Sequence, residues 1–210
     1  MNKKSAIALS LCAGLLLLQG VAADTGDRVI REHTFSLDEI NEIDLHAGVG
    51  SLKIVPAKGK EMRLILDIEG QDHGWFHHRR DVSDVDLESH VRGSRLVLDQ
   101  TDQDTKTEWT VEMPVVARTN IHMGVGQIDA EFGNTELRVE MGVGDVDVDM
   151  PAAGAGRIDM HVGVGDASVR GAHNVDHRHS FVSHSLEADG EGDNDVRIKV
   201  GVGDADLRLL

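Results

Sequence analysis

The chain is predicted to be all-β, a single-domain β-solenoid or β-helix-like stack with about 19 residues per coil and a less regular N-terminal half. The main observation is the tripeptide Gly-Val-Gly, which occurs five times, each time between two alternating apolar segments. Repeats of this kind are typical of solenoids, in which each repeat buries its apolar face against its neighbours. Helical periodicity is absent after the first segment. The copies lie at 48–50, 124–126, 142–144, 163–165 and 201–203.

The side-chain phase changes at each copy. A strand alternates its two faces strictly, so a shift of one residue at a fixed point indicates a corner or bulge there. Glycine suits such a corner because it tolerates positive φ and allows backbones to approach closely. We therefore expect each coil to have two sides of about nine residues, joined by this corner and by a weaker Gly/Asn turn. In one copy the inward residues are odd-numbered before the corner and even-numbered after it: Leu137, Val139, Met141 and Val143, then Val146, Val148 and Met150.

The spacings between copies set the expected order of the coils. From Gly124 they are 18 (142 − 124), 21 (163 − 142) and 38 (201 − 163) residues. We interpret the last spacing as two periods, with a degraded copy at 182–188. Between Ile54 and Thr119 the repeat is harder to follow. We expect strands there around 62–68, from Val85, at 96–98 and at 109–113, with antiparallel pairing open.

The first residues are predicted to be a secretory signal peptide, residues 1–23, with cleavage near Ala23. Two lysines precede an apolar run that is too short for a comfortable membrane span. Cleavage would remove Cys12, the only cysteine, so the remaining domain, residues 24–210, folds without a disulfide. This predicts a periplasmic or secreted protein with no transmembrane segment. Its net charge of −16 before cleavage argues against nucleic acid and anionic lipid as partners.

Several segments share a pattern of glycine-led corners between apolar strands: 35–37 to 50–54, 111–114, 121–123 and 124–129. In these segments the chain resembles the bacterial putative-adhesin domain family. The resemblance covers the chain from about Arg28 onward. It implies a single-domain β-solenoid in an exported or envelope-associated protein, with no established catalytic residues.

An acidic ladder follows the corner and is the first candidate site. Asp145, Asp166 and Asp204 occupy equivalent repeat positions, and Asp129, Asp147 and Asp206 form a second column. In-register stacking would place neighbouring carboxylates about 4.8 Å apart, where they repel unless they are protonated, solvated or bridged by a cation. Bridging of these carboxylates by calcium is one interpretation of the ladder. An exposed acidic face that prevents edge-to-edge aggregation is the simpler one.

A column of histidines precedes the corner and is the second candidate. His46, His122 and His161 share one repeat position, which Glu140 and Lys199 occupy in other copies. The position alternates with inward residues, so it should face solvent. His122, Glu140 and His161 would bind zinc or a similar metal if they stood on successive coils. Solvated histidines are the alternative reading. Further histidines cluster near 73–78 and 173–184.

Enzymatic chemistry is not expected. The chain contains no Gly-x-Ser-x-Gly elbow, no phosphate-loop lysine and no tyrosine for a sugar-binding platform. Trp109 alternates with core residues, and Trp75 lies in a polar segment. The sequence thus predicts no cofactor and a structural, adhesive or protein-interaction role at the cell envelope, with a zinc- or calcium-binding envelope protein as the alternative. Because the chain ends inside a strand, we also expect self-association through the solenoid ends.

Overall fold

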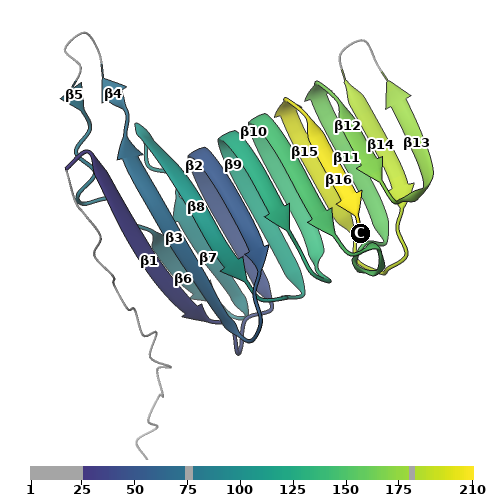
Figure 1. Cartoon of the computed structure of the whole chain (residues 1–210), viewed down its shortest axis with the longest axis horizontal. Coiled ribbons are helices and arrows are strands. Elements are labelled where there is room, and N and C mark those ends of the chain that lie inside the picture. The colour runs from purple at the N-terminus through teal and green to yellow at the C-terminus, as the bar shows by residue number, and fades with distance from the viewer. Residues whose placement is uncertain (1–25, 74–77, 180–182) are drawn as a thin grey trace, which may run out of the picture.

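The computed structural model describes residues 26–73, 78–179 and 183–210. The predicted signal peptide, Cys12 and Trp75 lie outside these ranges. Within them the protein is all-β, with a 14-stranded sheet that is not closed into a barrel and a small sheet formed by β4 and β5 (Figure 1). The described residues include one short 3-10 turn, η2 (Ala152–Gly154), and no α-helix. None of their helical segments has the length and apolar character to cross a bilayer.

The strands follow one another along the chain with short connections. Their bounds are β1 Arg28–Ser36, β2 Glu42–Pro56, β3 Glu61–Gly70, β4 Asp72–His73, β5 His78–Arg79, β6 Glu88–Arg92, β7 Arg95–Gln100, β8 Thr105–Met113, β9 Arg118–Glu131, β10 Glu136–Met150, β11 Arg157–Val164, β12 Ala167–Arg170, β13 His173–His179, β14 His184–Asp189, β15 Val196–Val202 and β16 Ala205–Leu209.

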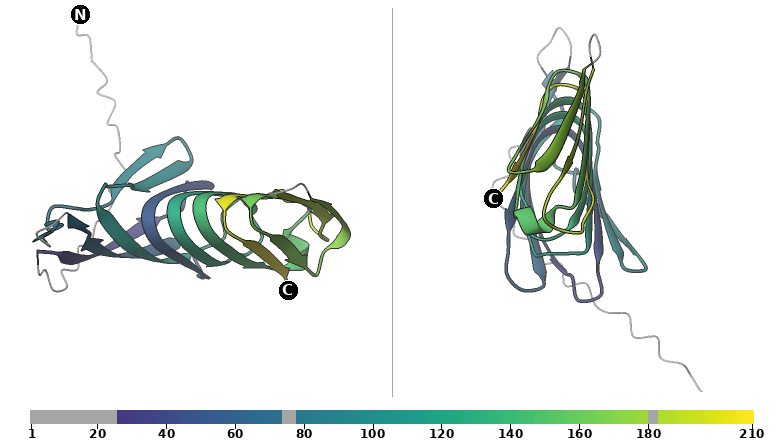
Figure 2. Two further views of the ribbon diagram at one scale, coloured as in Figure 1. Left: turned by 90° about the horizontal axis from the view of Figure 1, so that it is seen from above. Right: turned by 90° about the vertical axis from the view of Figure 1, so that its right-hand side faces the viewer.

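The glycine motif is a corner, as the side-chain phase predicts. β2, β9 and β10 run along one side of the molecule, turn at the motif and continue along the other side (Figure 2). In β10 the buried residues are odd-numbered up to Met141 and even-numbered from Val146. The third residue of each copy has positive φ, from 133° at Gly144 to 147° at Gly126. A Cβ on Gly144 would overlap the carbonyl oxygen of Gly126, so both the backbone angle and the stacking require glycine.

The central valine of each motif is exposed, which corrects the expectation that it points inward. Val49, Val125, Val143, Val164 and Val202 have exposed fractions of 41 to 50%. They are register partners, so they form an apolar ridge along the corner. Strict alternation places these valines in the core, but it takes no account of the change in chain direction at that point.

The order of strands in space differs from their order in sequence. On the first side of the corner the parallel order is β2, β9, β10, β15, β11, and β15 pairs in register with both β10 and β11. After the corner, β16 pairs with both β10 and β12. The last segment of the chain therefore lies inside the sheet (Figure 1). The expectation of an uncapped C-terminal coil is wrong, and with it the reason given for self-association.

The region expected to hold a degraded repeat forms an antiparallel hairpin instead. β14 pairs antiparallel with both β11 and β13. Residue 182, with which that repeat was expected to begin, lies outside the described residues. Counting periods alone could not detect this reversal, because antiparallel and parallel strands bury the same alternating residues, here Leu186 and Ala188.

The N-terminal half is less regular, as expected. β1, β3 and β8 pair antiparallel, and β8 then joins the second half of β2 in parallel. Trp109 in β8 is buried in the core. The strand expected from Val85 begins instead at Glu88, because residues 82–87 cross the end of the core. There Val82 and Val85 are buried, and Arg31 donates a hydrogen bond to the Val85 carbonyl at 3.2 Å.

Candidate functional site

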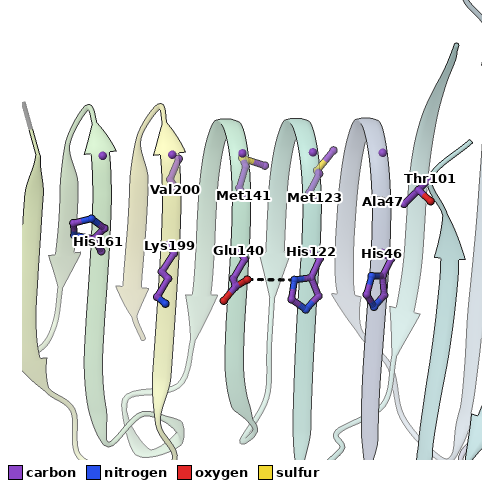
Figure 3. A pocket seen from close by; sticks show the side chains of 15 residues that line it. His46, Ala47, Thr101, His122, Met123, Glu140, Met141, His161, Lys199 and Val200 are labelled. Atoms are coloured by element: carbon purple, nitrogen blue, oxygen red, sulfur yellow. Dashed lines mark ion pairs between the residues drawn. The ribbon is translucent and has the colours of Figure 1, made fainter. Parts of the chain in front are cut away.

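A row of polar side chains runs across the sheet, two residues before the first glycine of each Gly-Val-Gly copy. Its members point outward from neighbouring strands, since they alternate with buried residues on each strand. Figure 3 shows five of them side by side. We call this set the histidine row; in spatial order it comprises Asp99 (β7), His46 (β2), His122 (β9), Glu140 (β10), Lys199 (β15) and His161 (β11).

Two contacts join three members of the histidine row, and a third ties its far end to β14. The rings of His46 and His122 stack with centroids 4.9 Å apart. Nδ1 of His122 lies 3.5 Å from Oε2 of Glu140 (Figure 3). At the far end, Nδ1 of His161 is 2.8 Å from Oγ of Ser185. The row thus places imidazoles, two carboxylates and an amine on the outer face of the sheet.

An open groove lies between the histidine row and the corner. Its volume is about 820 Å³, and every member of the row except Asp99 lines it, together with the first glycine of every copy. These glycines leave space above the backbone. They also cannot carry a Cβ easily: at Gly142 it would lie 2.6 Å from the carbonyl oxygen of Gly124. Four steps of about 4.8 Å between the five strands give the groove a length of roughly 19 Å.

The expected metal site at His122, Glu140 and His161 is not assembled as predicted. His122 and Glu140 are neighbours, but Lys199 stands between Glu140 and His161 because β15 is inserted there. Among the described residues, no group of three or more His, Cys, Asp or Glu is arranged to hold a metal ion. The metal-binding alternative is therefore not supported.

The acids that follow the corner form a ladder in the spatial order Asp145, Asp204, Asp166. Their side chains bond to the backbone of the next strand. Oδ1 of Asp145 accepts a hydrogen bond from the Asp204 amide at 3.1 Å, and Oδ1 of Asp204 accepts one from the Asp166 amide at 2.9 Å. Backbone amides at a bend need such acceptors, so this ladder has a structural role that the sequence did not reveal.

The second acidic column lies two residues further along the strands. Its spatial order is Asp129, Asp147, Asp206, Ser168. The pKa of Asp147 is raised, first by desolvation and then by the charges of Asp206, Asp129 and Asp145, with Arg208 opposing the shift. A raised pKa means that the ionised form of Asp147 is disfavoured in the folded protein.

Of the remaining histidines, His177 and His184 meet. Nδ1 of His177 lies 3.0 Å from Nε2 of His184, and Nδ1 of the buried His184 accepts a hydrogen bond from the Ala167 amide at 3.0 Å. His184 thus takes the place of a backbone carbonyl: the equivalent amides of Val146 and Ala205 donate to the carbonyls of Asp204 and Asp166. The side chains at 73, 77, 78 and 179 lie outside the described residues.

Comparison with known proteins identifies solved structures with a similar fold. No protein-family model matches the chain, and no curated protein does. The structure is similar to that of a putative cell adhesion protein from Clostridium sporogenes ATCC 15579, with 14% identity, a TM-score of 0.54, and coverage of 87% of this chain and 100% of that one. A putative adhesin from Bacteroides fragilis NCTC 9343 matches with 12% identity, a TM-score of 0.32, and 85% and 96% coverage. One from Parabacteroides distasonis ATCC 8503 matches with 10% identity, a TM-score of 0.31, and 87% and 71% coverage. The expected resemblance to putative-adhesin domains is thus confirmed at the level of the fold.

Proposed function

We propose that this chain is an exported, non-enzymatic adhesive protein whose residues 24–210 form one β-solenoid domain. Two observations support the proposal. Five bent strand segments stack in parallel and in register around one core, and the fold matches that of a putative cell adhesion protein. The predicted signal peptide would carry the chain to the periplasm or beyond.

The groove beside the corner is the proposed adhesive surface. The observation that carries this assignment is the continuous histidine row along an open groove of about 820 Å³. A groove that crosses five strands suits an extended partner segment rather than a small molecule, which usually binds in an enclosed pocket. The row presents donors and acceptors of both charges, so it can satisfy the polar groups of a protein or envelope component.

Charge distribution favours the histidine-row side over the opposite side as the contact surface. The row contains Lys199 and three imidazoles beside two carboxylates. After the corner, most outward positions of β9 and β10 are acidic. An acidic partner would be repelled there, whereas the row side accepts partners of either charge.

The proposal is tested by measuring how beads coated with the protein adhere to immobilised envelope fractions and to a casein-coated surface. The variant His122→Ala/Lys199→Ala removes two groups from the row and is expected to reduce adhesion. The matched control, Lys53→Ala/Asp129→Ala, removes a register-paired charge couple from the opposite side and is expected to leave adhesion unchanged. Equal adhesion by both variants, with folding confirmed by circular dichroism, would exclude the groove as the adhesive surface. No adhesion by the wild type above casein would reject the adhesive function itself.

A further inference from the structure

The C-terminal segment is a strand pair inserted into a slot. β15 and β16 are the last two strands in the sequence, yet each pairs along both of its edges with strands that come earlier in the sequence. Without this segment β10 would face β11 and β12 across an empty position, with unpaired backbone on both sides. We call this position between β10 and the pair β11 and β12 the slot; the C-terminal segment fills it and joins the strands on its two sides (Figure 1).

The slot is selective for its occupant. Six side chains of the segment are buried: Val196, Ile198, Val200, Ala205, Leu207 and Leu209.

The corner of the slot adds a stronger requirement for glycine. A Cβ at Gly203 would overlap the carbonyl oxygen of Gly144, and φ at Gly203 is 134°. At Gly201 a Cβ would likewise overlap the carbonyl oxygen of Gly142. An occupant thus needs alternating apolar residues around a Gly-x-Gly corner, and the C-terminal segment of a second copy meets this requirement in full.

The connection to the segment is short and polar. It runs from β14 through residues 190–195, with glycines at 190 and 192. The amide of Gly190 bonds to the carbonyl of Gly156 at 2.7 Å, and that of Gly192 bonds to the carbonyl of Ala155 at 2.7 Å. These contacts hold the connection against the turn that precedes β11. Because β14 stays paired with β11 of its own copy, exchange has to open this connection, and its two glycines make such an opening easier.

We propose that two copies of this chain can exchange their C-terminal segments, each filling the slot of the other. Exchange preserves every native contact of the segment, so its cost is confined to opening the monomer and to the entropy of association. The exchanged dimer would carry two grooves, and two linked sites raise avidity without any new contact. The exchange does not depend on the adhesive role of the groove, and its test needs no ligand.

Single-cysteine chains provide the test, in a Cys12→Ser background. Glu140 and Lys199 are register partners across the slot. A chain with Glu140→Cys and a tagged chain with Lys199→Cys are unfolded, refolded together and oxidised. Exchange places the two cysteines side by side, at the Cα separation that a disulfide needs, and is expected to give a covalent heterodimer.

The control is a second register pair, whose two strands both stay in the same chain when the C-terminal segments exchange. His122 and Glu140 are also register partners, but their strands, β9 and β10, are joined by a short turn in the same chain. Chains with His122→Cys and Glu140→Cys are expected to give no heterodimer beyond random oxidation. An equal heterodimer yield in both mixtures would overturn the proposal.

A second measurement keeps the test independent of refolding. The double variant Glu140→Cys/Lys199→Cys, oxidised as a native monomer, locks the segment in its own slot. Sedimentation should then show a monomer at every concentration, whereas the reduced form should gain dimer as concentration rises. A reduced form that stays monomeric after prolonged incubation at high concentration would also overturn the proposal.

Discussion

The third glycine of each motif should tolerate substitution less than any other residue of the motif, and Gly144→Ala tests this directly. Gly144 has a φ of 133°, and a Cβ there would overlap the carbonyl oxygen of Gly126. The overlap involves backbone in the middle of the stack, so it cannot be relieved by turning a side chain.

The magnitude follows from two contributions. An unfavourable backbone conformation costs about 1–3 kcal/mol. Overpacking adds about 1–3 kcal/mol more. Together they give a loss of roughly 4 kcal/mol, a large part of the ~5–15 kcal/mol that stabilises a typical domain. At about 2–4 °C per kcal/mol for a chain of this size, the melting temperature should fall by roughly 8–16 °C.

Gly48→Ala is the matched control, because Gly48 has room for a Cβ, unlike the first glycine of the other four copies. The nearest atom to its Cβ would be Cα of Thr101 at 3.4 Å, which is ordinary contact. Its stability should change by no more than about 1 kcal/mol. Thermal and urea unfolding followed by far-ultraviolet circular dichroism measures both variants. Equal destabilisation by the two substitutions would refute the attribution of the loss at Gly144 to its backbone angle and to the overlap with Gly126.

Three further substitutions test single interactions. Asp147→Asn should stabilise the protein at pH 7 by about 0.2–1 kcal/mol, since it removes an ionised carboxylate from between two others. Because the folded pKa is raised, this advantage should shrink as pH falls through that pKa and vanish below the ordinary value of 3.8; an advantage that persists there in urea titrations would contradict the reasoning. At Asp86, burial raises the pKa, but the hydrogen bond from His33 and further favourable interactions outweigh burial and lower it overall. Asp86→Asn should therefore destabilise the protein above pH 3.8, and the difference should disappear as pH falls through the lowered pKa; a loss independent of pH would point to packing instead. Among the described residues the buried indole NH of Trp109 has no hydrogen-bond partner, so Trp109→Phe should cost far less than the ~3–5 kcal/mol expected for Trp109→Ala. Similar urea midpoints for the two variants would disprove this.

Local features were predictable from the sequence because they follow from period-two alternation. The phase change in β10, with Met141 and Val146 both inward, is visible in the residue order and is confirmed. The exposed ridge was not predictable in this way, since alternation assigns Val143 to the core. At a corner the chain turns, and the side chain at the apex points away from both sides.

The order of the strands in space could not be predicted from the sequence, for a different physical reason. Every Gly-Val-Gly copy offers the same corner, the same apolar alternation and the same backbone pairing. β15 would stack on β10, on β11 or on a strand after β14 with similar local complementarity. The insertion of β15 between β10 and β11 depends on the reversed hairpin of β13 and β14, which carries the chain back toward the slot. Nothing in the repeat itself encodes that reversal.

This order decides the chemistry of the surface as well as the topology. With sequential stacking, His122, Glu140 and His161 would be neighbours, and two imidazoles with a carboxylate favour a metal ion. The inserted strand places the ammonium group of Lys199 between Glu140 and His161. A fixed positive charge there opposes a bound cation and supplies a donor for a partner's carbonyl or carboxylate. The same residues therefore form a mixed-charge surface in place of a metal site, and the C-terminal segment that fills the sheet also contributes the Lys199 side chain to the proposed adhesive groove.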